Sequence, residues 1–215
     1  MTGARFTERL RADSEWEAAV DNRFTQDLAA DTLDDEVFAR YLRQDYAFID
    51  ELVSLFGRAV ADAPTMAATG RFVDFLGVLT DEENDYFERS FAALGVEPSA
   101  YEDPDPTPAT AAFRDHLRAA GATGGYAETL AVLVPAEWVY LDWATAVADP
   151  PERFYLAEWV DLHANDEFAA FVEWMRSELD REGGALSARR ADRVARLFER
   201  TVRLEADFFA AAYDG

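Results

Sequence analysis

The chain contains no cysteine and no lysine, and only two of its 215 residues are histidine. The absence of cysteine excludes disulfides, thiolate metal ligands and cysteine nucleophiles. No segment approaches the roughly 18 consecutive apolar residues that a membrane span requires, and the first residues, MTGARFTERLRADSEW, lack the apolar region of a signal peptide. We therefore expect a cytoplasmic protein that has no membrane partner.

The charge of the chain is strongly one-sided. Its 20 basic residues, all arginine, face 43 acidic ones, which gives a net charge of −23. Because the acids are spread along the whole chain, the protein should repel DNA, RNA and anionic lipid headgroups. Such a composition suits a cytoplasm of molar salt, where screening removes most of the self-repulsion. We expect a halophilic protein with no nucleic-acid partner.

Apolar residues make up half of the chain and recur with helical periodicity. One stripe contains Trp16, Val20, Phe24 and Leu28, and a second runs from Val37 to Phe56. Further helices are predicted over about 65–93, 108–120, 125–148, 152–183 with a division near residue 165, and 187–213. Prolines at 98, 104, 106 and 108 make the stretch of about 95–108 the one long connection. The pattern predicts a single all-α domain over 1–215, a compact bundle of seven or eight helices.

Polar residues that interrupt apolar stripes are the candidates for a site in such a bundle. Asp45 shares a helix face with Tyr41 and Phe48, and a carboxylate among aromatic rings is costly unless it binds something. A partly exposed acid on an acid-rich helix is the alternative reading of this residue. Glu205 lies at the edge of a C-terminal apolar stripe. Its position also fits an ordinary surface glutamate near the end of the chain.

Metal and cofactor motifs are missing from the sequence. Neither His116 nor His163 belongs to an HExxH motif, and neither has a glutamate three residues before it, as a di-iron carboxylate site usually requires. The chain also lacks GxGxxG, P-loop and GxSxG patterns. We therefore predict no metal site and no cofactor.

Four segments in register resemble the TenA (thiaminase II) family. FARYLRQDYAFIDEL is similar to its F-x-x-Y-x-x-Q-D-x-x-Y/F signature, and LAVLVPAEWVYLDWA to its A-x-L-P-C-x-W-x-Y segment. FYLAEWVDLHANDEF and FERTVRLEADFFAAAY are similar to the family's last two motifs, so that the resemblance covers about 35–213. It implies a helical fold of the haem-oxygenase type without haem, an assembly into tetramers or dimers, and a pocket for the aminopyrimidine half of thiamin.

The resemblance also implies roles for individual residues. Asp45 would hydrogen-bond the pyrimidine ring nitrogen and amino group, and Phe48 would stack on the ring. Glu205 would be the acid or base that handles the leaving amine. The remaining residues implied to bind substrate are Tyr41, Phe113, Ala136, Tyr140 and His163.

Several positions depart from the family pattern. Ala136 stands where the family's catalytic cysteine adds to the pyrimidine, so thiamin cleavage by that route should be absent or very slow. Phe113 and His163 replace tyrosines. Glu137 is a third candidate catalytic carboxylate, as in a cysteine-less branch that relies on carboxylates. On a regular helix its side chain points about 100° away from Ala136, so that a distortion at Pro135 would be needed to turn it inward.

These observations favour a hydrolase of aminomethyl- or formylaminomethyl-pyrimidines, which are breakdown products of thiamin. The alternatives are a pyrimidine-binding protein that has lost its chemistry, and a regulator that acts through protein partners. A metal-dependent oxidase on the same scaffold is a fourth possibility. Surplus apolar residues such as Trp143, Trp159 and Trp174 suit either an oligomer interface or the core.

Overall fold

A computed structural model describes residues 4–214. Residues 1–3 and 215, the ends of the domain predicted over 1–215, lie outside this range. The described residues form eleven α-helices and one short 3₁₀ helix and contain no strand, which confirms the all-helical prediction. None of their helices is long and apolar enough to cross a membrane.

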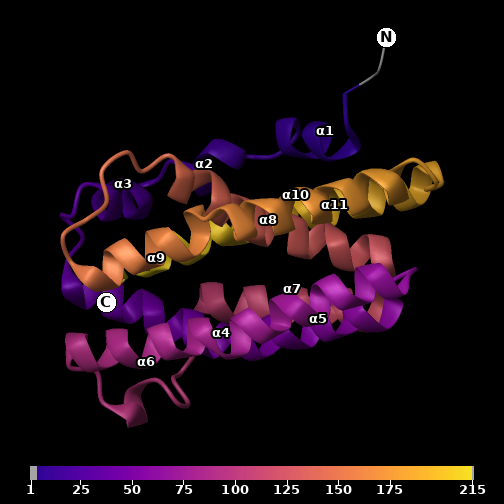
Figure 1. Ribbon diagram of the computed structural model, residues 1–215. Helices are drawn as coiled ribbons and strands as arrows, with labels where there is room; N and C mark the ends of the chain where they lie inside the picture. Colours follow the sequence, from indigo (N-terminus) through magenta and orange to yellow (C-terminus); the bar gives the residue numbers. More distant parts are fainter. Residues whose placement is uncertain (1–3, 215) are drawn as a thin grey trace.

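The helices form two main layers with a cap of short N-terminal helices (Figure 1). One layer contains α4 (Asp35–Asp62), α5 (Met66–Thr80), α6 (Glu82–Leu94) and α7 (Pro108–Thr123). The other contains α8 (Tyr126–Thr145), α9 (Phe154–Ala164), α10 (Asp166–Gly183) and α11 (Ala188–Ala211). The cap consists of α1 (Phe6–Ala12), α2 (Trp16–Val20) and α3 (Arg23–Ala29), while η1 (Pro98–Ala100) lies within the predicted connection.

There are more helices than the seven or eight predicted, for local reasons. The N-terminal region forms three short helices, and α3 begins at a capping box in which Asn22 and Thr25 satisfy each other's backbone N–H groups. The predicted helix over about 65–93 is two helices that meet at Asp81. The predicted end near residue 93 is confirmed, because α6 ends at Leu94 and the following Gly95 adopts the left-handed conformation at φ 68°.

Helix α8 lies at the centre of the molecule. Sixteen of its twenty residues are buried, and it packs against α4, α7, α9, α10 and α11. Pro135 lies inside this helix, which continues through it from Tyr126 to Thr145. A helix that is buried on all sides presents every face to a neighbour, and this decides which of its residues reach the candidate site.

Two of the surplus tryptophans belong to the core, and the third, Trp174, is half-buried and packs against it. Trp143 and Trp159 are buried, and the ring centroid of Trp174 lies 4.9 Å from that of Phe72. The large apolar side chains that remain exposed are Met66, Val73, Val78 and Phe154, three of which lie on α5.

Candidate active site

A cavity opens between the two layers, beside the middle of α8. The space available to the centres of water-sized spheres is about 60 Å³, several times the roughly 10–15 Å³ that one water needs. A cavity of this size suits a small ligand. Its lining comes from α4 to α11 and consists of Asp45, Phe48, Ile49, Leu52, Phe75, Val78, Leu79, Glu83, Phe113, Ala136, Glu137, Tyr140, Trp159, Leu162, His163, Phe168, Glu205 and Phe208.

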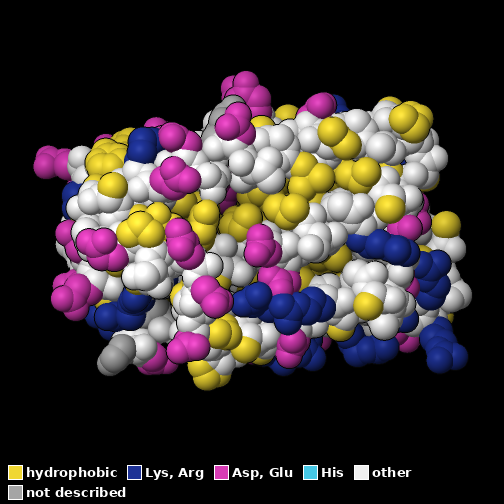
Figure 2. Space-filling model, turned by 90° about the horizontal axis from the view of Figure 1, so that it is seen from below, with side chains coloured by type: hydrophobic (Ala, Val, Ile, Leu, Met, Phe, Trp, Pro, Cys, Tyr) yellow, Lys and Arg dark blue, Asp and Glu magenta, His cyan; other side chains and the backbone are white. Residues whose placement is uncertain are grey.

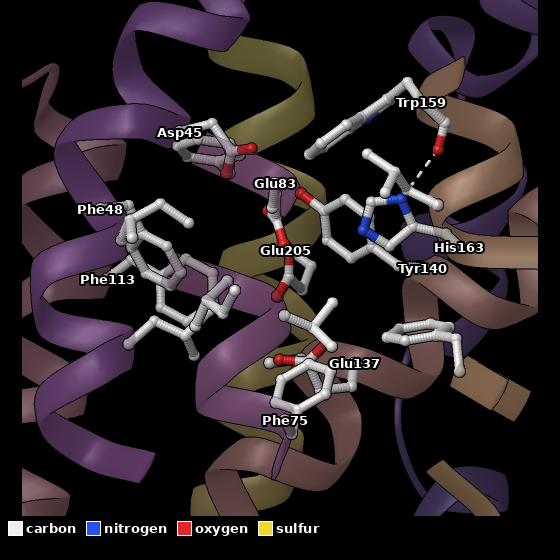
Figure 3. Close-up of a pocket in the computed structure, with 18 residues that line it drawn as sticks. Asp45, Phe48, Phe75, Glu83, Phe113, Glu137, Tyr140, Trp159, His163 and Glu205 are labelled. Atoms are coloured by element: carbon white, nitrogen blue, oxygen red, sulfur yellow. Dashed lines mark hydrogen bonds between the residues drawn. The ribbon is translucent and has the colours of Figure 1, made fainter. Parts of the chain in front are cut away.

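Four carboxyl groups from four different helices face this cavity. Asp45 comes from α4, Glu83 from α6, Glu137 from α8 and Glu205 from α11. Figure 3 shows them one below another through the middle of the view. Asp45, Glu137 and Glu205 are only 6%, 7% and 2% exposed, whereas Glu83 is half-buried.

The surroundings favour the protonated form of each carboxyl group. Burial raises the pKa of Asp45 to about 8, and the neighbouring Tyr41 hydroxyl opposes this rise. Burial also raises the pKa of Glu137 to about 8, with a contribution from the charge of Asp45. The pKa values of Glu83 and Glu205 lie well above the usual range, first because of burial and then because of Asp45 and Glu137. Within the part of the chain that the structure describes, no arginine lines the cavity.

Aromatic side chains form two walls on either side of the carboxyl groups (Figure 3). Phe48 and Phe113 lie on one side, with ring centroids 4.7 Å apart. Tyr140, Trp159 and His163 form the other side, where His163 lies 4.8 Å from Tyr140 and 4.5 Å from Trp159 between ring centroids. Flat walls of this kind accept a flat aromatic ring between them.

His163 is a neutral member of the second wall. Its Nδ1 lies 2.8 Å from the carbonyl oxygen of Trp159, so that Nδ1 carries the hydrogen and donates it, which leaves Nε2 as an acceptor. Burial lowers the pKa of the imidazole to about 4, against the effect of this hydrogen bond. His163 therefore adds no positive charge to the cavity at neutral pH.

The structure brings eight of the nine predicted site residues to this one cavity. They are Asp45, Phe48, Phe113, Ala136, Glu137, Tyr140, His163 and Glu205. Tyr41 is the exception, because it is buried behind the lining and its hydroxyl oxygen lies 2.7 Å from that of Tyr140. Tyr41 thus supports Tyr140 and Asp45 from behind and does not face a ligand in the cavity.

Ala136 and Glu137 both border the cavity, although they are adjacent on α8. The helix is continuous through Pro135, so the expected local distortion is not what places Glu137 inside. The reason is that α8 is buried all round and the cavity extends over neighbouring faces of it.

Several other lining residues were not predicted from the sequence. Glu83 belongs to the acidic run TDEEND, which lies inside the single helix predicted over about 65–93 and was not singled out there. Trp159 and Phe208 read as ordinary core aromatics. Periodicity did not reveal the break at Asp81, after which α6 begins and carries Glu83 in its first turn beside the cavity.

Comparison with known protein families identifies the family of this chain. Residues 10–215 match the sequence model of the TENA/THI-4/PQQC family. The chain belongs to this family. Among curated relatives, an aminopyrimidine aminohydrolase of Halalkalibacterium halodurans is 24% identical over 95% of this chain and 92% of its own length. An aminopyrimidine aminohydrolase of Helicobacter pylori is 25% identical over 94% of each chain.

Solved structures agree on the fold. A TenA family transcription regulator from Silicibacter sp. TM1040 superposes with a TM-score of 0.87 at 24% identity, over 97% of this chain and 96% of that one. A TenA homologue from P. horikoshii OT3 gives 0.86 at 22% identity, over 98% and 99%. A domain from Shewanella denitrificans described as having a heme oxygenase-like fold gives 0.66 at 16% identity, over 97% and 90%. The predicted fold type is thereby confirmed.

Proposed function

We propose that this protein hydrolyses aminopyrimidines that carry an aminomethyl or formylaminomethyl substituent, as formed when thiamin breaks down. For the aminomethyl compound, water and the protonated amine give the hydroxymethylpyrimidine and an ammonium ion. Oxygen from water replaces nitrogen on the methylene carbon, and the formylated compound would release formamide in the same way.

The observation that carries this proposal is the combination of buried carboxyl groups with aromatic walls in one small cavity. A 4-aminopyrimidine is flat, and its protonated edge presents adjacent N–H groups that suit a carboxylate. Asp45 would accept hydrogen bonds from this edge, while Phe48 and Tyr140 would contact the ring faces. The curated relatives named aminopyrimidine aminohydrolase support the same substrate class.

The chemistry requires a proton donor and a proton acceptor, and carboxyl groups supply both without a thiol. Glu205, whose pKa is well above its usual range because of burial, would hold a proton at pH 7. It would donate this proton to the nitrogen of the neutral formylamino substituent as it departs, or to the ammonia released from the already protonated aminomethyl substituent. Glu137, with a pKa raised to about 8, would accept a proton from the attacking water in its ionised form. Coupled carboxyl groups titrate as a set, so that mixed protonation states are available near neutral pH.

Replacing Glu205 with glutamine tests this role. Glu205→Gln keeps the shape of the side chain but cannot donate an acidic proton. We therefore expect turnover of the formylated compound, whose leaving nitrogen brings no proton of its own, to fall by about 10²–10⁴-fold. Asp207 is an exposed residue two positions further along the same helix, and Asp207→Asn should leave the rate unchanged. Full activity of Glu205→Gln on both pyrimidines would contradict the assignment.

A pyrimidine-binding or regulatory protein is the second candidate. It is favoured by alanine at position 136, where the family resemblance implies a nucleophilic cysteine, and one structural relative is described as a transcription regulator. Such a protein would be stabilised against heat by pyrimidines but would release no hydroxymethylpyrimidine. The charge of −23 argues against direct contact with DNA, so regulation would need a protein partner.

We also propose that the protein works in a salt-rich cytoplasm as a tetramer or dimer. The acidic, lysine-free composition supports the first point. The exposed apolar side chains Met66, Val73 and Val78 along α5 support the second, because burying them against another copy removes apolar area from water.

A further inference from the structure

Glu83 is the one carboxyl group of the cavity for which the proposed reaction has no use. It lies in the first turn of α6, which begins at Glu82, whereas the other three carboxyl groups lie in the interiors of α4, α8 and α11. The N-terminal end of a helix carries partial positive charge and stabilises a nearby carboxylate. Glu83 is also half-buried while the others are buried. Burial and the charges of Asp45 and Glu137 raise its pKa. Its place at the helix end and its greater exposure oppose this rise, so that a bound cation can bring Glu83 into the ionised form.

No described side chain neutralises this group. Glu83 has neither an ion-pair partner nor a hydrogen-bond partner among the described side chains, all of whose arginines lie outside the cavity lining. The one basic side chain of the lining, His163, is held neutral by its burial. An ionised Glu83 would therefore need its countercharge from a bound cation.

The two candidate substrates differ in whether they bring this charge. The protonated edge of the pyrimidine ring supplies one positive charge, for which Asp45 is the proposed partner. An aminomethyl substituent is protonated near neutral pH and supplies a second charge, at a different position from the protonated ring edge. A formylaminomethyl substituent is a neutral amide and supplies none.

We infer that Glu83 is a specificity-determining residue that binds the ammonium group of the substrate, and that the cavity therefore selects aminomethylpyrimidine over its formylated form. The inference rests on the proposed substrate class. It deepens that proposal by assigning the fourth carboxyl group, which lies within the same cavity as Asp45 and Glu205 (Figure 3). Glu83 would act on binding, while Glu205 would act on the chemical step.

The test compares wild type, Glu83→Gln and Glu88→Gln on two ligands that differ only in the charge of the substituent. Glu88 is an exposed residue of the same helix, which makes it a matched control. Aminomethylpyrimidine is the charged ligand and hydroxymethylpyrimidine the neutral one, and the affinity of each is measured by competition and by thermal shift. Initial rates on the aminomethyl and formylaminomethyl compounds are measured in parallel.

For Glu83→Gln we expect the affinity and KM for aminomethylpyrimidine to weaken by about 10- to 100-fold, as expected for the loss of a charge-assisted contact, while kcat stays within about threefold. Binding of hydroxymethylpyrimidine and turnover of the formylated compound should not change, and Glu88→Gln should behave as wild type. Glu83→Asp keeps the charge, so this variant should bind aminomethylpyrimidine more tightly than Glu83→Gln does, though less tightly than wild type.

Equal losses for charged and neutral ligands, or no loss for either, would overturn the role of Glu83. Because affinity is measured separately from turnover, the two proposals fail separately. A wild type that binds the amine through Glu83 but hydrolyses nothing would refute the hydrolase and keep the recognition. If the wild type hydrolyses both pyrimidines and Glu83→Gln is indistinguishable from it, the hydrolase proposal stands and the role of Glu83 is refuted.

Discussion

Position 136 shows how one residue changes the chemistry that a cavity can support. The Ala136 side chain borders the cavity next to Glu137, and a sulfur atom there would face several carboxyl groups. Negative and apolar surroundings raise the pKa of a thiol, and the thiolate is the nucleophile. Thus restoring cysteine alone should not restore thiamin cleavage.

Ala136→Cys provides a direct measurement of this environment, because the chain has no other cysteine. We expect its alkylation by iodoacetamide to be half-maximal above pH 9, since burial and carboxylates both oppose ionisation. Ala210→Cys, at an exposed position of α11, should titrate near the ordinary thiol value of about 8.5. A thiol at 136 that is fully reactive at pH 7, or rapid thiamin cleavage by this variant, would contradict the description of the cavity.

Glu137 links the cavity to the stability of the protein. Its pKa is about 8 in the folded protein because of burial, against about 4.3 in an unfolded chain. Below pH 4 both states hold the proton, so the group has no effect on stability. Between about pH 4 and 8 the unfolded state releases its proton first, and stability falls as pH rises.

Glu137→Gln should therefore raise the free energy of unfolding at pH 8 by about 1–3 kcal/mol and leave it nearly unchanged at pH 4. Thermal or urea unfolding at the two pH values measures this difference, with Asp207→Asn as the exposed control. A variant that is less stable than wild type at pH 8 would show that Glu137 is held ionised by a favourable partner in the folded state.

At the scale of the helix, α6 carries Glu83 and depends on how its ends are fixed. Gly95 ends the helix at φ 68°, a conformation in which a side chain is strained. Gly95→Ala should destabilise the protein by about 1 kcal/mol. Gly57→Ala, inside α4 where an added Cβ meets nothing within 4 Å, should be neutral or stabilising by up to about 1 kcal/mol. Equal effects of the two changes in urea unfolding would contradict the assigned cap.

The sequence predicted most helices but not all of their breaks. Proline positions located the connection before Pro108, and Gly95 and Asn165 marked helix ends correctly, because each acts through its own backbone or side chain. The break at Asp81 carries no proline or glycine signal, and Asp81 makes no side-chain cap to α6. It was therefore missed, and with it the position of Glu83.

The site was predicted best where family motifs were present. Spacing within one helix brought Asp45 and Phe48 to the same face, and the motifs added Glu205 and Tyr140 from other helices. The motifs do not show which of their neighbouring residues face the cavity, because this depends on how the two helix layers pack. Tyr41, for example, lies outside the lining, and its hydroxyl contacts that of Tyr140.

At the scale of the whole molecule, the surface and the cavity are both acidic. Acidic side chains are spread across the face shown in Figure 2, with arginines gathered toward one end of it. A negative surface attracts cations toward the protein, and this attraction weakens as salt increases. In molar salt the discrimination between charged and neutral pyrimidines must therefore come from contacts inside the cavity.

The most direct test of the central claim is turnover in molar KCl of aminomethylpyrimidine, formylaminomethylpyrimidine and thiamin, with release of hydroxymethylpyrimidine as the common readout. We expect product from the aminomethyl compound, less from the formylated compound, and little or none from thiamin. Efficient cleavage of thiamin would contradict the claim that carboxyl groups act here without a nucleophilic thiol. Failure to release product from either pyrimidine would contradict the proposed hydrolase itself.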